Sequence, residues 1–334
     1  MQKLQGGLSV LMPVYTTNPN WLKAAVRSVL EQTFEDFDFI IVDDGSDITT
    51  KKVLGEFARQ DKRIKLVENC VNMGLTRSLN RGLRLCGTKW VARMDSDDVA
   101  LPNRLEIQAA YLAEHPETSV LGTGAAYLES GRAFPFKHPP VRHEEIIAML
   151  PFVCPFAHPS VVLNRDEVLA AGGYPDTQHA EDYALWLSLL LDHPGARFHI
   201  IPDILLRYRR GLDRPLYRAR QTESTELLQK DCFRRLVPNA DPSAAEKIFL
   251  PKTRCQDVLS TLQLVSQIKT GVRKRFPEAD PLFLARGALR LKRQILASTQ
   301  FSGYGTGCRR ALMKSEYFLI SSLIQVRRSF FACL

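Results

Sequence analysis

The sequence has no closely spaced pair of cysteines and no hydrophobic run long enough to cross a bilayer. Its seven cysteines are scattered over 334 residues, and none belongs to a CxxC pair. An odd number of isolated cysteines argues against a disulfide framework and against a thiolate zinc site. The first residues, MQKLQGGLSVLMPVY, also lack the long apolar segment of a signal peptide. The expected location is therefore the cytoplasm, with the inner face of a membrane as an alternative.

The net charge of +9 is unevenly distributed along the chain. Basic residues gather after Leu250, where acidic residues are few, at Lys252, Arg254, Arg273, Lys274, Arg275, Arg290, Lys292, Arg293, Arg309, Arg310, Arg327 and Arg328. Such a region favours a phosphate-rich partner, either an anionic membrane surface or nucleic acid. Nucleic acid is not expected, because no basic module with interleaved aromatic residues is present. A solvated basic helix face with a buried final helix at Tyr317–Leu334 explains the pattern equally well.

Short apolar runs alternate with amphipathic segments over the first two hundred residues. Strands are expected at Leu8–Val14, Phe37–Val42, Ile64–Glu68 and Trp90–Met94, with helical segments between them. This alternation predicts an α/β fold with a mostly parallel, Rossmann-like central sheet flanked by helices. Beyond Arg218 the pattern becomes mainly helical. We therefore predict an α/β domain over residues 1–215 and a basic, mainly helical appendage over residues 216–334.

Two of the predicted strands end in clustered carboxylates. Asp43 and Asp44 follow one strand, and Asp95, Asp97 and Asp98 follow another. Ligands of doubly wound sheets bind beyond the carboxyl ends of the strands. Carboxylate oxygens suit Mg²⁺ or Mn²⁺, and a cation would relieve the repulsion between such close acids. The alternative for each cluster is a solvated turn, and Asp98 is expected to cap the following helix.

Eight segments between Leu8 and Arg209, taken in order, resemble the inverting family 2 glycosyltransferases with the GT-A nucleotide-sugar fold. Each segment alone is a weak signal, but together they are specific. They are SVLMPVY, SVLEQTF, IIVDDGS, NMGLTRSLNRGL, ARMDSDDVALPNRL, FAHPSVVLNRDEVLAAGGY, AEDYALWLSLL and LLRYR.

The resemblance implies a binding site for a nucleotide diphosphate sugar, with a UDP-sugar as the preferred donor. One carboxylate of the Asp43–Asp44 pair would bind the base, and Asp95 and Asp97 would bind Mn²⁺ or Mg²⁺. Asn80 would lie on a helix close to the nucleotide. The residues carried over to the donor side are Pro13, Tyr15, Asp43, Asp44, Asn72, Gly74, Arg93, Asp95, Ser96 and Arg209.

The resemblance also implies an acceptor side. Glu181 and Asp182 match the acidic pair that opens the acceptor-side helix, and Asp182 is the expected general base. Acids at a helix N-terminus are favoured by the helix dipole in any case, which is the structural alternative. His158 and Trp186 are assigned to the acceptor side, with a structural role for His158 and core packing for Trp186 as the alternatives.

The expected activity is metal-dependent inverting transfer of a hexosyl or N-acetylhexosaminyl group to a glycan or lipid-linked acceptor, in the synthesis of a cell-surface polysaccharide. One departure from the family pattern concerns the metal. Many relatives carry a histidine after the Tyr-Arg dipeptide, but here Arg210 follows Tyr208 and Arg209. A sugar nucleotidyltransferase and a non-catalytic nucleotide-sugar-binding protein remain as alternatives.

Overall fold

The computed structural model describes residue 4 and residues 6–209, 215–241, 243, 246, 248–249 and 253–300. The chain divides into two compact units, of which the first contains Met1–Arg142 and Pro155–Ser224 and the second His143–Cys154 and Thr225–Leu334. This division differs from the boundary predicted at residue 215. Residues His143–Cys154, which include helix α5 (His143–Met149), group with the C-terminal helices.

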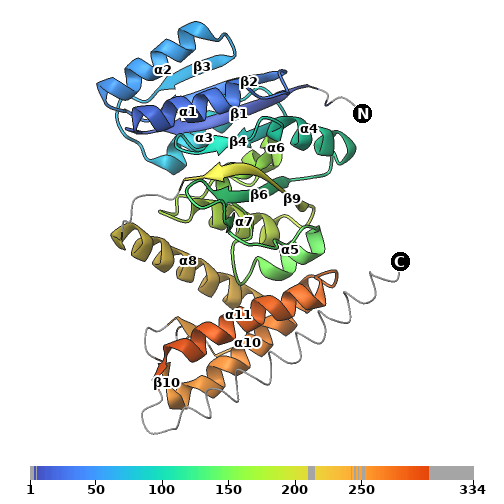
Figure 1. The fold of residues 1–334 in the computed structure, drawn as a ribbon. Helices are drawn as coiled ribbons and strands as arrows, with labels where there is room; N and C mark the ends of the chain where they lie inside the picture. Colours follow the sequence, from blue (N-terminus) through green and yellow to red (C-terminus); the bar gives the residue numbers. More distant parts are fainter. Residues whose placement is uncertain are drawn as a thin grey trace. The chain divides into compact units, whose positions relative to one another are not determined.

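The first unit is built around one mixed sheet (Figure 1). Its strands run in the order β3-β2-β1-β4-β8-β6-β9-β5, and β7 pairs with β6. The first four are parallel, whereas β8 joins both β4 and β6 in antiparallel fashion. The strands are β1 (Leu8–Val14), β2 (Phe37–Asp43), β3 (Ile64–Glu68), β4 (Trp90–Arg93), β5 (Val99–Ala100), β6 (Val120–Tyr127), β7 (Ala133–Phe134), β8 (Val162–Asn164) and β9 (Phe198–Tyr208).

Helices cover both faces of the parallel half, as the buried strands require. On β1, alternate residues Leu8, Val10 and Met12 belong to the core beneath α1. Leu11 points the other way and packs so closely on Gly82 of α3 that a side chain at Gly82 would overlap it. The helices are α1 (Pro19–Leu30), α2 (Ile48–Gln60), α3 (Leu75–Leu85), α4 (Arg104–Glu114), α6 (Arg165–Ala170) and α7 (Glu181–Asp192), with a 3₁₀ turn at His158–Ser160.

The second unit is helical. Besides α5 it contains α10 (Cys255–Arg275) and α11 (Pro281–Ser298), and α8 (Pro215–Leu236) runs from the first unit into it. Strands β10 (Thr253–Arg254) and β11 (Thr299–Gln300) form a separate two-stranded pairing. No helix in the described part of the chain is both long and apolar enough to span a bilayer. The predicted final helix at Tyr317–Leu334 lies outside the described residues.

Candidate active site

The candidate site lies at the carboxyl end of the parallel strands. Strand β1 pairs with β2 on one side and with β4 on the other, so the strand order reverses at β1. Such a reversal leaves a crevice beyond the strand ends, where the connecting loops diverge. The acidic segments that follow β2 and β4 both lie at this edge, as the sequence predicted.

Three carboxylates gather in the loop after β4. Side-chain oxygens of Asp95, Asp97 and Asp98 all lie within 4.8 Å of one another. Burial, followed by the charge of Asp95, raises the pKa of Asp97 to about 6. The same two causes, joined by the charge of Asp97, raise the pKa of Asp98 well above its ordinary value. The positive charge that the protein supplies therefore only partly offsets the burial and mutual repulsion of these acids.

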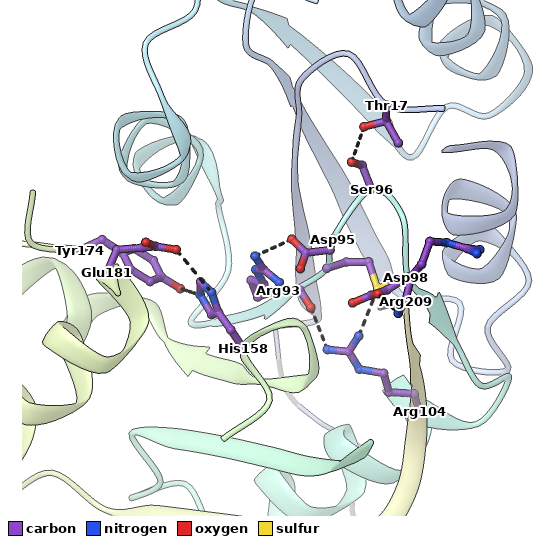
Figure 2. A network of polar contacts seen from close by, with 11 residues as sticks. Thr17, Arg93, Asp95, Ser96, Asp98, Arg104, His158, Tyr174, Glu181 and Arg209 are labelled. Carbon is purple, nitrogen blue, oxygen red and sulfur yellow. Dashed lines mark hydrogen bonds and ion pairs between the residues drawn. The ribbon is translucent and has the colours of Figure 1, made fainter. Parts of the chain in front are cut away.

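Arg93 is the buried cation beside this cluster (Figure 2). Its side chain is 3% exposed, and Nη2 lies 2.5 Å from Oδ1 of Asp95. Burial acts to lower the pKa of Arg93, but the nearby acids, Asp95 foremost, outweigh it and raise the pKa, so the guanidinium stays charged. Among the described residues, nothing accepts a hydrogen bond from its Nε or Nη1. Arg93 therefore retains two unpartnered guanidinium nitrogens, Nε and Nη1, that could donate to a ligand.

A second arginine, Arg104, binds the main chain at the end of β4. Arg104, which is 1% exposed, donates from Nη2 to the main-chain carbonyl of Arg93 at 2.8 Å and from Nε to Gln108 at 3.1 Å. Burial and the charge of Arg93 lower its pKa to about 9. Arg104 was not among the predicted site residues, because its position on the helical pattern carried no sign of this contact.

Arg209 closes the acidic loop from β9. Its backbone N–H donates to Oδ1 of Asp98 at 2.7 Å, and its Nε donates to the carbonyl of Asp97 at 2.8 Å. Its guanidinium also lies over the ring of Trp21, 4.5 Å from the centroid. The residues that follow Arg209, where family members carry the histidine, lie outside the described part.

Asp98 does not cap the next helix, so that prediction is wrong. Helix α4 begins at Arg104, with Asn103 in the cap position. Asp98 instead accepts from Arg209, while its Oδ2 is buried and has no partner among the described residues. The free oxygen places Asp98 with Asp95 and Asp97 as a candidate ligand.

Asp44 holds the loop that follows β3. Its Oδ1 accepts from Asn69 Nδ2 at 2.6 Å and from the Met73 N–H at 2.8 Å, and its Oδ2 accepts from the Gly74 N–H at 2.8 Å. Gly45 has a φ of +73°, and a Cβ on it would lie 2.8 Å from the backbone of Val71 and Asn72. Glycine is therefore required there for both conformation and space.

Asp43 differs from Asp44 in having an unused oxygen. Its Oδ1 accepts from the Ser46 N–H at 2.9 Å, whereas Oδ2 is buried and lacks a partner in the described part of the chain. Of the predicted pair, Asp43 is thus the better candidate for binding a nucleobase N–H, and Asp44 for shaping the loop.

The remaining donor-side predictions lie in different surroundings. Pro13 is buried within β1, while Tyr15, directly beyond the strand, is 56% exposed. Asn72 is exposed on the loop that Asp44 holds. The hydroxyl of Ser96 contacts the Thr17 hydroxyl at 2.7 Å and joins the acidic loop to the loop after β1. Thr17 was not predicted, and a lone threonine gives no signal by which to find it.

The acidic pair Glu181 and Asp182 opens α7. Burial and then the charge of Asp182 raise the pKa of Glu181 to about 7. Burial also raises the pKa of Asp182, which is half-buried and whose Oδ1 accepts from the N–H of Tyr183 at 2.7 Å. Arg93 and Asp95 act electrostatically on both acids. The acids after β4 and those at the start of α7 therefore share one electrostatic site.

Two predicted acceptor-side residues are buried. Trp186 is fully buried, so its ring has no free face to stack on a sugar, and core packing is its role. His158 is 9% exposed and lies between Tyr174 and Glu181 on one side and Arg93 on the other (Figure 2). Asn80, expected near the nucleotide, is engaged with the backbone of Tyr174. Tyr174 was missed, because its distant partners are not evident from the sequence.

The acidic loop fits a divalent cation. It offers hard oxygen donors from three closely spaced carboxylates, one of them the unpartnered Oδ2 of Asp98. The pKa values of Asp97 and Asp98 are raised, and a bound cation would lower them by stabilising the ionised carboxylates.

The family model described as glycosyl transferase family 2 matches residues 9–173. The O-antigen biosynthesis glycosyltransferase WbnJ of Escherichia coli is 34% identical over 205 residues, which cover 60% of this chain and 79% of the relative. The amylovoran biosynthesis glycosyltransferase AmsE of Erwinia amylovora is 33% identical, over 61% and 77%. An E. coli UDP-Gal:alpha-D-GlcNAc-diphosphoundecaprenol beta-1,3-galactosyltransferase is 32% identical, over 60% and 73%.

Solved structures share the fold at low sequence identity. S. aureus TarS 1-349 in complex with UDP-GlcNAc matches with a TM-score of 0.57 and 17% identity, over 86% of this chain and 90% of that one. The mannosyltransferase PcManGT from Pyrobaculum calidifontis, in complex with GDP-Man and Mn²⁺, matches with a TM-score of 0.53 and 16% identity, over 96% and 86%. The family model, the relatives and the fold agree, and the chain belongs to glycosyl transferase family 2 and is a glycosyltransferase.

Proposed function

We propose that this enzyme transfers a sugar from a nucleotide diphosphate sugar, preferably a UDP-sugar, to a hydroxyl group of a glycan or lipid-linked acceptor, with inversion at the anomeric carbon. The observation that carries the proposal is the arrangement around Arg93. The acids after β4 lie beside this buried cation, and the acids at the start of α7 are close enough to respond to its charge. The groups proposed to bind the donor therefore lie near the group proposed to activate the acceptor.

Asp182 is the proposed general base. It takes the proton from the acceptor hydroxyl while that oxygen forms a bond to the anomeric carbon and the bond to the diphosphate breaks. A single displacement of this kind inverts the configuration. Asp182 is preferred to Glu181 because it is the more exposed of the two, whereas Glu181 is buried beside His158.

Asp95, Asp97 and Asp98 are the proposed ligands of Mn²⁺ or Mg²⁺, which supplies positive charge to the departing diphosphate when bound. Arg93 adds a fixed positive charge and two nitrogens, Nε and Nη1, that have no partner among the described residues. Pre-positioned charges of this kind stabilise the developing negative charge more than they stabilise the ground state.

The donor and acceptor classes are supported by the comparisons. The named substrates of the relatives and structural neighbours include UDP-sugars, GDP-mannose and a diphosphoundecaprenol-linked sugar. A lipid-linked acceptor would bring the enzyme to an anionic membrane surface. The exposed Arg273, Lys274 and Arg275 at the end of α10 are the groups proposed to contact it.

The test is release of nucleotide from a panel of UDP- and GDP-sugars, with Mn²⁺, with Mg²⁺ and after chelation. Asp97→Asn should reduce metal-stimulated turnover by about a hundredfold or more, as expected when a transition-state charge loses its partner. Asp166→Asn is the matched control, because Asp166 is an exposed carboxylate on α6. Equal turnover in Asp97→Asn and Asp166→Asn would contradict the assignment of the metal ligands.

The base is tested by comparing Asp182→Asn with Glu181→Gln. Asp182→Asn should lower the rate of transfer by about a hundredfold or more, while donor affinity stays near that of the wild type. Donor affinity is measured by calorimetry with UDP and Mn²⁺, independently of turnover. A larger loss of transfer in Glu181→Gln than in Asp182→Asn would move the base to Glu181.

A further inference from the structure

A line of side-chain contacts runs from α3 to α7 through residues that the proposed reaction does not use. It begins at Asn80, whose Nδ2 donates to the carbonyl of Tyr174 at 2.8 Å and whose Oδ1 accepts from the Tyr174 N–H at the same distance. Gly173 has a φ of +81°, and a Cβ on it would overlap the Asn80 amide. The backbone of Tyr174 is therefore fixed in one position against α3.

The side chain of Tyr174 continues the line. Its hydroxyl lies 2.9 Å from Nε2 of His158, and both residues are buried. Burial raises the pKa of Tyr174 far above its ordinary range, so the phenol keeps its proton. Burial and the charge of Arg93 lower the pKa of His158 well below its ordinary value, so the imidazole is neutral. A neutral imidazole has one N–H, and two tautomers are open to it.

The last contact favours one of these tautomers. Nδ1 of His158 lies 4.0 Å from Oε1 of Glu181 (Figure 2). Above pH 7, where Glu181 is ionised, a proton on Nδ1 would point toward a carboxylate oxygen, whereas a lone pair there would face it and repel it. With the proton on Nδ1, Nε2 is free to accept from the Tyr174 hydroxyl.

We propose that Asn80, Tyr174 and His158 form a positioning chain in which Tyr174 donates to Nε2 of His158, and His158 presents its Nδ1–H toward Glu181 at the start of α7. The role given to this chain rests on the proposed function. Asp182 projects from the same helical turn as Glu181, so the chain also sets the place of the base. These residues are positioning residues, since none of them is assigned a contact with a reacting atom.

The chain also ties the acceptor side to the donor side. Asn80 lies on α3, and α3 begins directly after Gly74, whose N–H is held by Asp44. Helix α3 therefore borders the loop after β3, which Asp44 holds, at its first turn, and it contacts the backbone of Tyr174 further along. Loss of the Tyr174 hydroxyl should therefore disturb Glu181 and Asp182 without disturbing the loop after β3.

The tautomer is measured by long-range ¹H–¹⁵N correlation of the histidine rings in the full-length protein, which has seven histidines. His158→Gln assigns the His158 signals. At a pH above the pKa of Glu181, we expect the wild-type ring to carry its proton on Nδ1. Tyr174→Phe should keep the proton on Nδ1 but shift the Nε2 resonance, because that nitrogen loses its hydrogen-bond donor. Tyr111→Phe is the matched control, because Tyr111 on α4 stacks between His115 and His199. A wild-type Nε2–H tautomer, or an Nε2 resonance in Tyr174→Phe unchanged from wild type, would overturn the proposal. If Tyr174→Phe does not fold, the wild-type tautomer alone decides.

The kinetic readout is donor hydrolysis or transfer with the best sugar of the panel. Tyr174→Phe should lower kcat by about tenfold or more, since small displacements of a catalytic group are costly. The KM for the donor should stay within about twofold, and Tyr111→Phe should match the wild type. An active wild type with equal kcat in the two Tyr→Phe variants would overturn the positioning role. A wild type inactive on every donor would contradict the proposed function. The tautomer of His158 would still test the proposed positioning chain.

Discussion

Replacing Asp44 with asparagine tests whether this carboxylate holds the loop after β3 rather than the nucleotide. Its two oxygens accept three hydrogen bonds, from Asn69, Met73 and Gly74. Asparagine has only one acceptor oxygen, so its amide N–H would face a peptide N–H of the loop. A hydrogen bond to a charged group contributes about 1.5–3 kcal/mol, and the free energy of unfolding should fall by about that amount.

Asp43→Asn should behave in the opposite way. The asparagine oxygen can keep the contact with the Ser46 N–H, and its amide replaces the unpartnered Oδ2. The free energy of unfolding should therefore change by less than about 1 kcal/mol. If Oδ2 accepts a hydrogen bond from a nucleobase N–H, the amide would repel that group. The affinity for UDP should then fall by about ten- to a hundredfold.

Both effects can be read in separate assays. Calorimetry with UDP and Mn²⁺ gives the affinity. Urea unfolding followed by tryptophan fluorescence gives the stability of the first unit, because all three tryptophans, Trp21, Trp90 and Trp186, lie in it. Wild-type UDP affinity in Asp43→Asn would refute the assignment of Oδ2 to the base. Wild-type stability in Asp44→Asn would refute the role of Asp44 in holding the loop.

Three further predictions concern stability and the buried ring. The pKa of Glu181 rises from 4.5 to about 7 on folding, through burial and then Asp182. The folded state thus binds the proton more tightly, and the unfolding free energy should fall by up to about 3 kcal/mol as the pH rises through that window; urea midpoints for Glu181→Gln should lack this slope. Gly45→Ala should lower the free energy of unfolding by about 1–3 kcal/mol through backbone strain. Gly87→Ala should not, because nothing lies within 4 Å of a Cβ placed there. Equal losses in the two variants would contradict the argument. Trp186→Phe should leave the acceptor KM unchanged, since the ring is fully buried, and a raised KM would mean that it reaches the acceptor.

The strands were predictable because each is a local pattern. Leu8–Val14 and Ile64–Glu68 have the bounds expected from their apolar runs. The short strand Val99–Ala100 was not predicted, because two residues carry no periodic signal, and it is defined by its pairing with β9. The family resemblance also indicated the acidic segments, and their meeting at one edge follows from the parallel pairing of neighbouring strands.

Contacts between side chains distant in sequence were beyond prediction for a physical reason. Asn80 and Tyr174 are 94 residues apart, and their meeting depends on β8 pairing antiparallel to β4. That pairing returns the chain to the sheet beside β4, and α6, which follows β8, packs on α3. No local pattern records this return. The burial of Trp186 depends on it as well, because the ring packs against Phe156 and His158 from the segment leading into β8.

The same return of the chain explains how the acids after β4 and those at the start of α7 can influence one another. Strand β4 carries Arg93 at its end, and the segment before β8 carries His158, so the antiparallel pairing brings His158 within the electrostatic influence of Arg93. Two groups of carboxylates would repel each other if they met without charge between them. Arg93 lies between them and acts on both, which lowers the cost of bringing them together. A buried arginine at the strand end therefore lowers the cost of placing the proposed metal-binding acids near the proposed base.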